Sequence, residues 1–157
     1  MTHAGFVSQT QDLDLSTMDG LAQLEAIFGG QLPRPPIAET LGMENFSGER
    51  GAVSVELVPQ HRHYNPLGSM HGGVISTLLD TAAACSVHST LAAGELYTSL
   101  DLTVKFLRPV TVDSGRLRAE GSVLQRGRRT ALAQAHLYDA DRRLLAHATS
   151  TCMIFAA

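Results

Sequence analysis

The sequence predicts one α+β domain in which an antiparallel sheet curls around a single long, buried helix. Residues 72–91 form the longest apolar segment, with apolar residues at helical spacing and almost no charge on any face. Four segments of alternating apolar and polar residues follow, separated by breaks of which the last two are short enough for hairpins. A sheet needs a cover on its apolar face, and this helix is the only segment that supplies one.

The composition is that of a folded chain of 157 residues, with 44% hydrophobic and 17% charged residues. No apolar run reaches the roughly 18 residues of a membrane span, and the net charge of -3 argues against a generally basic nucleic-acid binder. We therefore expect neither a membrane nor nucleic acid as partner. The start of the chain shows no secretory signal, and Cys85 and Cys152 are interpreted as reduced, buried thiols, so we expect a cytoplasmic protein.

The first half of the domain is less regular. Residues 1–17 are expected to be a flexible segment, and residues 18–157 to be the domain. A helix is predicted over Met18–Phe28, because Leu21, Leu24 and Ile27 share one face, and Gly29 and Gly30 end it.

Three prolines within residues 33–36 predict an extended crossing, followed by a strand around Thr40–Phe46. Clean alternation predicts a strand over Ala52–Val58, and turn-forming residues predict a loop over Gln60–Met70. The sheet should contain about five or six strands. The four predicted segments after the helix are Leu96–Leu107, Gly115–Gln125, Thr130–Asp139 and Arg142–Phe155.

Asp80 lies in the middle of the buried helix, where loss of hydration makes a carboxylate costly unless it is paired. No Lys or Arg stands three or four residues away, so no local ion pair accounts for it. Two interpretations remain: a carboxylate bonded to backbone or to a distant Arg, or a general base or nucleophile.

The helix begins at His71-Gly72-Gly73, where the first backbone N–H groups have no partner within the helix. Glycine lets another group approach this backbone, and the helix dipole adds partial positive charge. The segment is therefore either a tight loop-to-helix turn or an oxyanion hole for acyl transfer.

Gly73 and Asp80 are seven residues apart, about 10.5 Å along a helix. One carbonyl is not expected to touch both from a single chain. Two copies with antiparallel central helices would bring the glycine of one to Asp80 of the other, so the spacing favours a homodimer with shared sites.

The run from Asn65 to Asp80 resembles the signature of hotdog-fold acyl-CoA thioesterases of the PaaI-like, phenylacetic acid degradation-related group. The resemblance extends over nearly all of residues 18–155. It includes Leu32–Leu41, the Tyr97–Pro109 strand, the Arg126–Arg129 hairpin and the closing Ala146–Cys152 strand. It implies a hotdog fold, a homotetramer made of two dimers, and hydrolysis of an acyl-CoA to the free acid and coenzyme A.

The resemblance also implies roles for five residues. Asp80 matches the catalytic acid, acting as general base or nucleophile, and Gly72 matches the glycine whose N–H polarises the thioester carbonyl. Asn65 matches the asparagine that places the thioester or the attacking water, and His71 matches a positioning histidine. Ser99 aligns with a serine that binds the water. Some relatives carry Glu where this chain has Asp80, which leaves the choice between base and nucleophile open.

Substrate contacts are expected from Gly73 and Thr77 on the helix and from Arg126, Arg128 and Arg129. This arginine turn is either an ordinary solvated hairpin or a contact for coenzyme A phosphates.

No cofactor is needed, and no metal is expected. His61, His63 and His71 lack a nearby Cys or carboxylate to complete a metal site. The acyl group is interpreted as aryl or medium-chain. The alternatives are a non-catalytic acyl-CoA-binding hotdog protein and an acyl-thioester hydratase or dehydratase.

Overall fold

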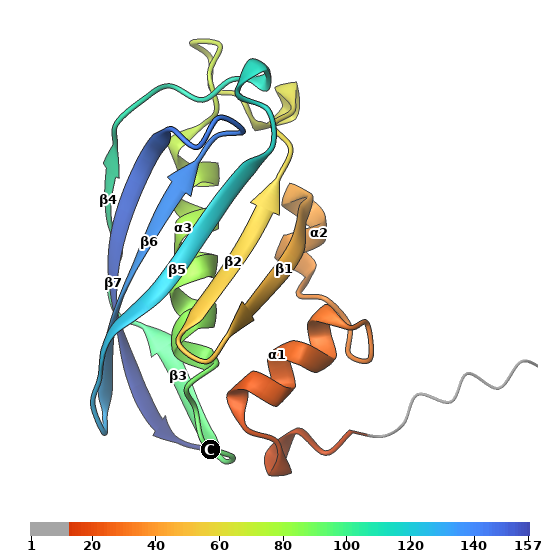
Figure 1. The fold of residues 1–157 in the computed structure, drawn as a ribbon, viewed down its shortest axis with the longest axis vertical. Helices are drawn as coiled ribbons and strands as arrows, with labels where there is room; N and C mark the ends of the chain where they lie inside the picture. The colour runs from red at the N-terminus through yellow and green to blue at the C-terminus, as the bar shows by residue number, and fades with distance from the viewer. Residues whose placement is uncertain (1–12) are drawn as a thin grey trace, which may run out of the picture.

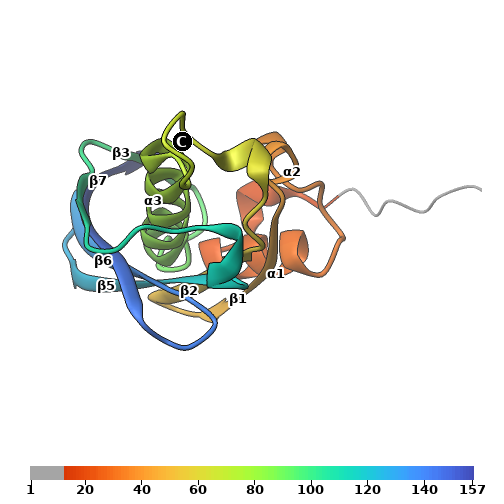
Figure 2. The ribbon, with the colours of Figure 1, turned by 90° about the horizontal axis from the view of Figure 1, so that it is seen from above.

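The computed structural model describes residues 13–157, which form one long helix wrapped by a seven-stranded antiparallel sheet (Figures 1 and 2). The strand order is β1-β2-β5-β6-β7-β3, and β4 also pairs with β7. The helices are α1 (Gly20–Phe28), α2 (Pro36–Leu41) and α3 (Gly72–His88), with short 3-10 turns at Leu15–Thr17, His61–His63 and Val112–Ser114. The strands are β1 (Met43–Glu49), β2 (Ala52–Leu57), β3 (Glu95–Ser99), β4 (Thr103–Phe106), β5 (Leu117–Arg126), β6 (Thr130–Tyr138) and β7 (Leu144–Ala156).

This architecture confirms the α+β hotdog prediction. The strand count exceeds the expected five or six because residues 96–107 form two strands along the same edge of β7. In β3, Ser99 is aligned with Cys152, and in β4, Thr103 is aligned with Thr149. Between them the chain stays attached to β7, since the Asp101 carboxylate accepts a bond of 2.9 Å from the Thr151 N–H.

The N-terminal part differs from the prediction in one element. Residues 36–41, expected to be extended, form helix α2, and the following strand β1 begins at Met43. Pro36 is the first residue of this helix, where a missing N–H costs nothing and the fixed φ favours helix. Of the segment expected to be flexible, residues 1–12 lie outside the described part of the chain, and Leu15–Thr17 form a 3-10 turn.

Helix α3 fills the concave side of the sheet. Its buried side includes Leu78, Leu79, Ala82 and Ala83, all with no exposed surface. The strands that face it supply small side chains, which let the sheet close around the helix. The small side chains include five fully buried alanines: Ala119, Ala133, Ala135, Ala146 and Ala148. Within residues 13–157, no helix is both long enough and apolar enough to cross a membrane.

The tightest contact between α3 and the sheet is at Gly121 of β5. A Cβ atom at this glycine would lie 2.1 Å from the Ala82 carbonyl oxygen and 2.6 Å from Ser86 Oγ. Ser86 Oγ also accepts a bond of 2.9 Å from the Val53 N–H, so the same turn of α3 is fixed to β2. Helix and sheet therefore meet backbone to backbone at this point.

We expect Gly121→Ala to lower the free energy of unfolding by about 3 kcal/mol, because the methyl group forces the helix away from β5. Ser122→Ala, at the next residue of the same strand, is the matched control and should change it by less than about 0.5 kcal/mol. Urea unfolding of the two variants measures the difference. Equal midpoints for the two would contradict a contact that only glycine permits.

Candidate active site

Asp80 lies at the middle of α3, on the flank that faces β3. The Ser99 hydroxyl of β3 donates a hydrogen bond of 3.3 Å to Asp80 Oδ1. The carboxylate is partly buried, and this burial raises its pKa above the ordinary range, while the bond from Ser99 acts in the opposite direction. Asp80 is thus a carboxylate of increased basicity held by one neutral donor.

No cation within the described part of the chain neutralises Asp80. Among residues 13–157, no Lys, Arg or His side chain forms an ion pair with it. The distant Arg considered as a structural explanation is therefore not found there. Burial raises the pKa of Tyr97 on β3, and the charges of Cys85, Cys152 and Asp80 add to this rise. We call Asp80 and Ser99 the Asp80 half-site.

The start of α3 is fixed by His71. The ring Nδ1 of His71 accepts a bond of 2.9 Å from the Gly73 N–H, so His71 is the N-cap of the helix. The backbone N–H of His71 donates to the His63 carbonyl. The Gly73 N–H is therefore already used within the chain. The Gly72 N–H has no acceptor among the described residues, so of the two glycines only Gly72 presents a free donor.

Gly72 borders an open depression that Asn65 and Phe106 also line. The ring of Phe106, on β4, lies so close that a Cβ on Gly72 would be 3.1 Å from it. The side-chain oxygen Oδ1 of Asn65 accepts bonds from the N–H groups of Leu67 and Ser69. Its side-chain amide donates to Ser69 Oγ, which leaves one amide hydrogen unused. Asn65, Gly72 and Phe106 form what we call the Gly72 half-site.

The two half-sites do not meet within one chain. Gly72 and Asp80 are eight residues apart on a continuous helix, about 12 Å along its axis. The structure brings Asn65 to Gly72 and Ser99 to Asp80. Thr77 lies between them on α3, partly exposed, and its hydroxyl donates 2.8 Å to the Gly73 carbonyl.

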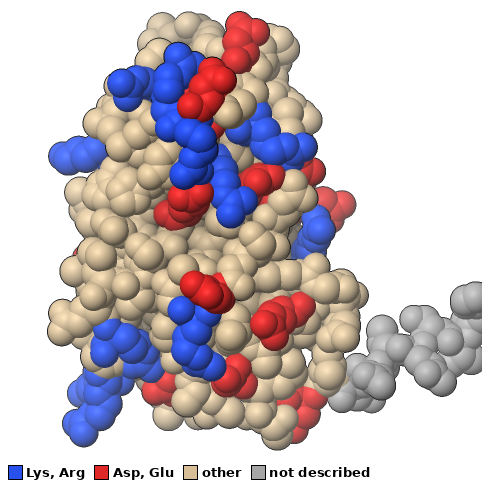
Figure 3. Space-filling view, in the orientation of Figure 1, with Lys and Arg blue, Asp and Glu red and all other residues tan. Residues whose placement is uncertain are grey.

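The arginine turn between β5 and β6 contains two kinds of residue. Arg126 is held inside the chain, with Nη2 2.6 Å from Glu95 Oε2 and Nε 3.2 Å from Thr90 Oγ1. Arg128 and Arg129 are exposed and have no ion-pair partner among residues 13–157. Figure 3 shows blue side chains at the end of this hairpin, at the lower left, away from the mixed charges higher on the same face.

The histidines do not form a metal centre in the described part of the chain, where no three His, Cys, Asp or Glu side chains come together as ligands. His63 uses both ring nitrogens, with Nδ1 accepting from the Gln60 N–H and Nε2 bonded to the Leu41 carbonyl. Burial lowers its pKa, which favours the neutral ring. His63 therefore holds the loop before α3 in place.

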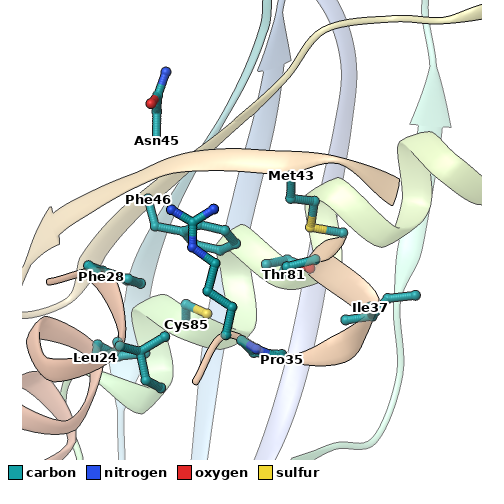
Figure 4. Close-up of a pocket in the computed structure, with 12 residues that line it drawn as sticks. Leu24, Phe28, Pro35, Ile37, Met43, Asn45, Phe46, Thr81 and Cys85 are labelled. Carbon is teal, nitrogen blue, oxygen red and sulfur yellow. The ribbon is translucent and has the colours of Figure 1, made fainter. Parts of the chain in front are cut away.

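Two features of the site were not anticipated from the sequence. Phe106 lies within the alternating segment Leu96–Leu107, but its contact with Gly72 depends on the register of β4 against β7. The second feature is an apolar cavity between α1, α2, β1 and α3, shown in Figure 4. It was missed because residues 36–41 were expected to be extended.

We expect Ser99→Ala to raise the pKa of Asp80 further, because the variant removes a donor that stabilises the charged carboxylate. The titration of the Asp80 carboxyl carbon, followed by NMR in labelled protein, should move to higher pH. Thr98→Ala, at the neighbouring residue of β3, is the control and should leave it unchanged. A titration that stays in place in Ser99→Ala would show that the hydroxyl does not act on the carboxylate.

Comparison with known proteins gives a consistent set of relatives. The model of the thioesterase superfamily matches residues 67–146, which include Gly72, Asp80 and Ser99. Escherichia coli YigI, named a medium/long-chain acyl-CoA thioesterase, is 34% identical over 134 residues, covering 76% of this chain and 85% of that protein. Its Salmonella typhimurium counterpart is 35% identical, in a match that spans 54% of this chain and 62% of that protein.

Solved structures extend the similarity to the fold. A phenylacetic acid degradation-related protein from Ralstonia eutropha superposes with a TM-score of 0.74 at 32% identity, covering 82% of this chain and 97% of that one. The PaaI protein of Escherichia coli gives a TM-score of 0.75 at 21% identity, with coverage of 88% and 94%. At that identity the second comparison concerns the fold alone.

Proposed function

The chain belongs to the thioesterase superfamily, and from this premise we propose that it hydrolyses acyl-CoA thioesters at a site shared between two copies. The observation that carries the proposal is Asp80, a partly buried carboxylate that forms no ion pair within residues 13–157 and accepts a hydrogen bond from the Ser99 hydroxyl. Such a group weakens the fold and is retained where chemistry requires it. The name of the Escherichia coli relative supports an acyl-CoA substrate.

Asp80 has two possible roles in this reaction, both supported by its raised pKa. As general base it takes a proton from water while the water oxygen bonds to the thioester carbon. As nucleophile it attacks that carbon itself and forms an anhydride, which water then hydrolyses. In both cases the carbon–sulfur bond breaks, the coenzyme A thiolate takes up a proton, and the acyl group leaves as the free acid.

The Gly72 N–H is proposed to hold the carbonyl oxygen as negative charge develops on it. It is the free donor at the positive end of α3, and no side chain of its own blocks the approach. Asn65 has one amide hydrogen left for the thioester or the water. His71 keeps this arrangement in place, since it caps the helix through Gly73.

The separation of the half-sites supports a homodimer. Gly73 and Thr77 lie on the side of α3 that is turned away from the sheet core, where an antiparallel copy of the helix would pack. Nearby, β3 is the last strand of the sheet, and it carries the exposed Leu96, followed by the exposed Leu100. We propose that these surfaces join two copies and place Asp80 of one copy against Gly72 of the other.

Arg128 and Arg129 are the arginines proposed to contact coenzyme A phosphates, because both are exposed and have no ion-pair partner in the described chain. Arg126 is proposed to hold the hairpin through Glu95 instead. Cys85 and Cys152 are free thiols, which suits the reducing cytoplasm in which we propose the enzyme works.

Asp80→Asn is expected to lower kcat for acyl-CoA hydrolysis by about 10²–10⁴-fold, the range for loss of a catalytic base. Because burial raises the pKa of Asp80, its ionisation disfavours the folded state at neutral pH, so the Tm should be equal or higher. Asp113→Asn, at an exposed carboxylate, is the control for both quantities. Thiol release measures turnover, and loss of enoyl absorbance without thiol release would instead identify a hydratase. Wild-type turnover in Asp80→Asn would refute the assigned role.

Mixing two inactive variants tests the shared site. Gly72→Pro removes the N–H at the first helical position, which tolerates proline, and the extended His71 before it suits a following proline. Gly72→Ala keeps the N–H and controls for added bulk beside Phe106. When Asp80→Asn and Gly72→Pro subunits are refolded together in equal amounts, mixed dimers keep one intact site, so activity should recover to about a quarter of wild type. No recovery, with mixed dimers verified by mass spectrometry, would contradict a site shared between copies.

A further inference from the structure

A cavity of about 280 Å³, with mostly apolar residues and a few polar ones in its lining, lies between α1, α2, β1 and α3, outside both half-sites. Its volume is at the lower end of the range for small-molecule sites. Figure 4 shows side chains from all four elements around the same space. They include Leu24 and Phe28 of α1, Ile37 of α2, Phe46 of β1, and Thr81 and Cys85 of α3.

The walls suit a hydrocarbon chain. Phe28 and Phe46 stack with ring centroids 5.4 Å apart and form one wall. The polar atoms at the cavity are mostly occupied: the Thr81 hydroxyl donates to the Thr77 carbonyl, and the Asn45 amide donates to Glu56. Of the lining residues only Arg34 is charged, and it is exposed. A hydroxylated aromatic ring would therefore find few hydrogen-bond partners inside the cavity, whereas methylene groups lose no hydrogen bonds when they leave water.

The cavity adjoins the Asp80 half-site through α3. Thr81 follows Asp80 directly, and Cys85 lies little more than one turn further along the helix. Burial raises the pKa of the Cys85 thiol to about 12, and the Asp80 charge adds to this rise. A chain that leaves a thioester at Asp80 along this helix passes Thr81 and Cys85.

The cavity is built by two local irregularities of the fold. In β1 the register shifts between Glu44 and Ser47, and Asn45 has a positive φ of 50°. The ring of Phe46 borders the cavity beside this bulge, while the side chain of Asn45 points away from it on the other side of β1 (Figure 4). The second irregularity is α2, the helix that begins at Pro36 and adds Ile37 and the buried Ala38 to the lining.

We propose that this cavity binds the acyl chain of the substrate as an unbranched aliphatic chain, and that its depth limits the chain length. The inference rests on the proposed acyl-CoA hydrolysis and adds the class of acyl group to it. The residues that set the limit are those at the cavity walls on α1, α2, β1 and α3.

Filling the cavity from α3 is the direct test. Cys85→Phe adds an aromatic ring at the wall, and Cys85→Ala removes the thiol without filling the space. Each buried methylene contributes about a factor of four in affinity. The ratio of kcat/KM for decanoyl-CoA to that for acetyl-CoA should therefore fall at least about tenfold in Cys85→Phe and stay within about twofold in Cys85→Ala. A ratio in Cys85→Phe equal to that of wild type would overturn the assignment.

A second variant covers the case in which Cys85→Phe does not fold. Ile37 is 49% exposed at the cavity edge, so Ile37→Trp adds bulk from the solvent side, with Ile37→Ala as its control. The same fall in the decanoyl-to-acetyl ratio is expected for Ile37→Trp. An unchanged ratio in a folded Ile37→Trp protein would count against the cavity as the acyl site.

Binding of a thioether analogue of decanoyl-CoA separates this inference from the proposed function. Calorimetry should show that the affinity of wild type for the analogue falls as the acyl chain of the analogue is shortened. Cys85→Phe should show a similar loss of affinity for the analogue with the full-length acyl chain. If wild type binds the analogue in this way but hydrolyses no thioester, the cavity assignment stands and the proposed function fails. If wild type hydrolyses thioesters but analogue affinity does not depend on Cys85→Phe, the proposed function stands and the cavity assignment fails.

Discussion

The close contact between α3 and β5 is the constraint on which the rest of the structure depends. At Gly121 the strand approaches the Ala82 carbonyl so closely that no side chain fits between them. This contact fixes the rotation of α3 about its axis, because Ala82 must face the sheet. The rotation in turn decides that Asp80 points toward β3 and that Cys85 borders the cavity beside α1.

The same rotation explains why Asp80 is partly buried without a compensating cation. Ala83 and Val87, on the same helix, are fully buried, so Asp80 lies at the edge of the apolar contact with the sheet. The Ser99 hydroxyl supplies a single hydrogen bond, which is less than a buried carboxylate needs to be stable. A base of raised pKa is useful for catalysis at the expense of stability, a trade-off common at active sites.

The sequence was sufficient for the fold because the strongest patterns lie in the longest elements. Helix α3 begins at Gly72 as predicted, since His71 and the two glycines mark the start and the apolar spacing continues to His88. The weaker predictions concern short segments in which tertiary contacts decide the outcome. Consecutive prolines are compatible with an extended chain and with a helix start, and only the packing of Ala38 shows that α2 is formed.

The candidate site was predictable to a similar degree. The residues around the helix start and Asp80 are local in sequence, and their chemistry follows from helix geometry. The partners that come from distant strands are not local: Phe106 reaches Gly72, and Glu95 holds Arg126, only because β3 and β4 line up along β7. A turn that contains three arginines carries no information about which of them is held by an acid from another strand.

One helix thus serves three separate tasks through three of its surfaces. Its N-terminus presents the Gly72 N–H, the flank toward β3 presents Asp80, and the flank toward α1 and α2 forms a wall of the cavity with Thr81 and Cys85. Since a rigid helix holds these groups at fixed spacing, none can move toward another within one chain. A second copy of the helix is the simplest way to bring a donor to the carboxylate, while the cavity beside each Asp80 needs no second chain for its walls. On the proposed assignments, reaction chemistry depends on association, and selection of the acyl chain depends on the fold of each subunit.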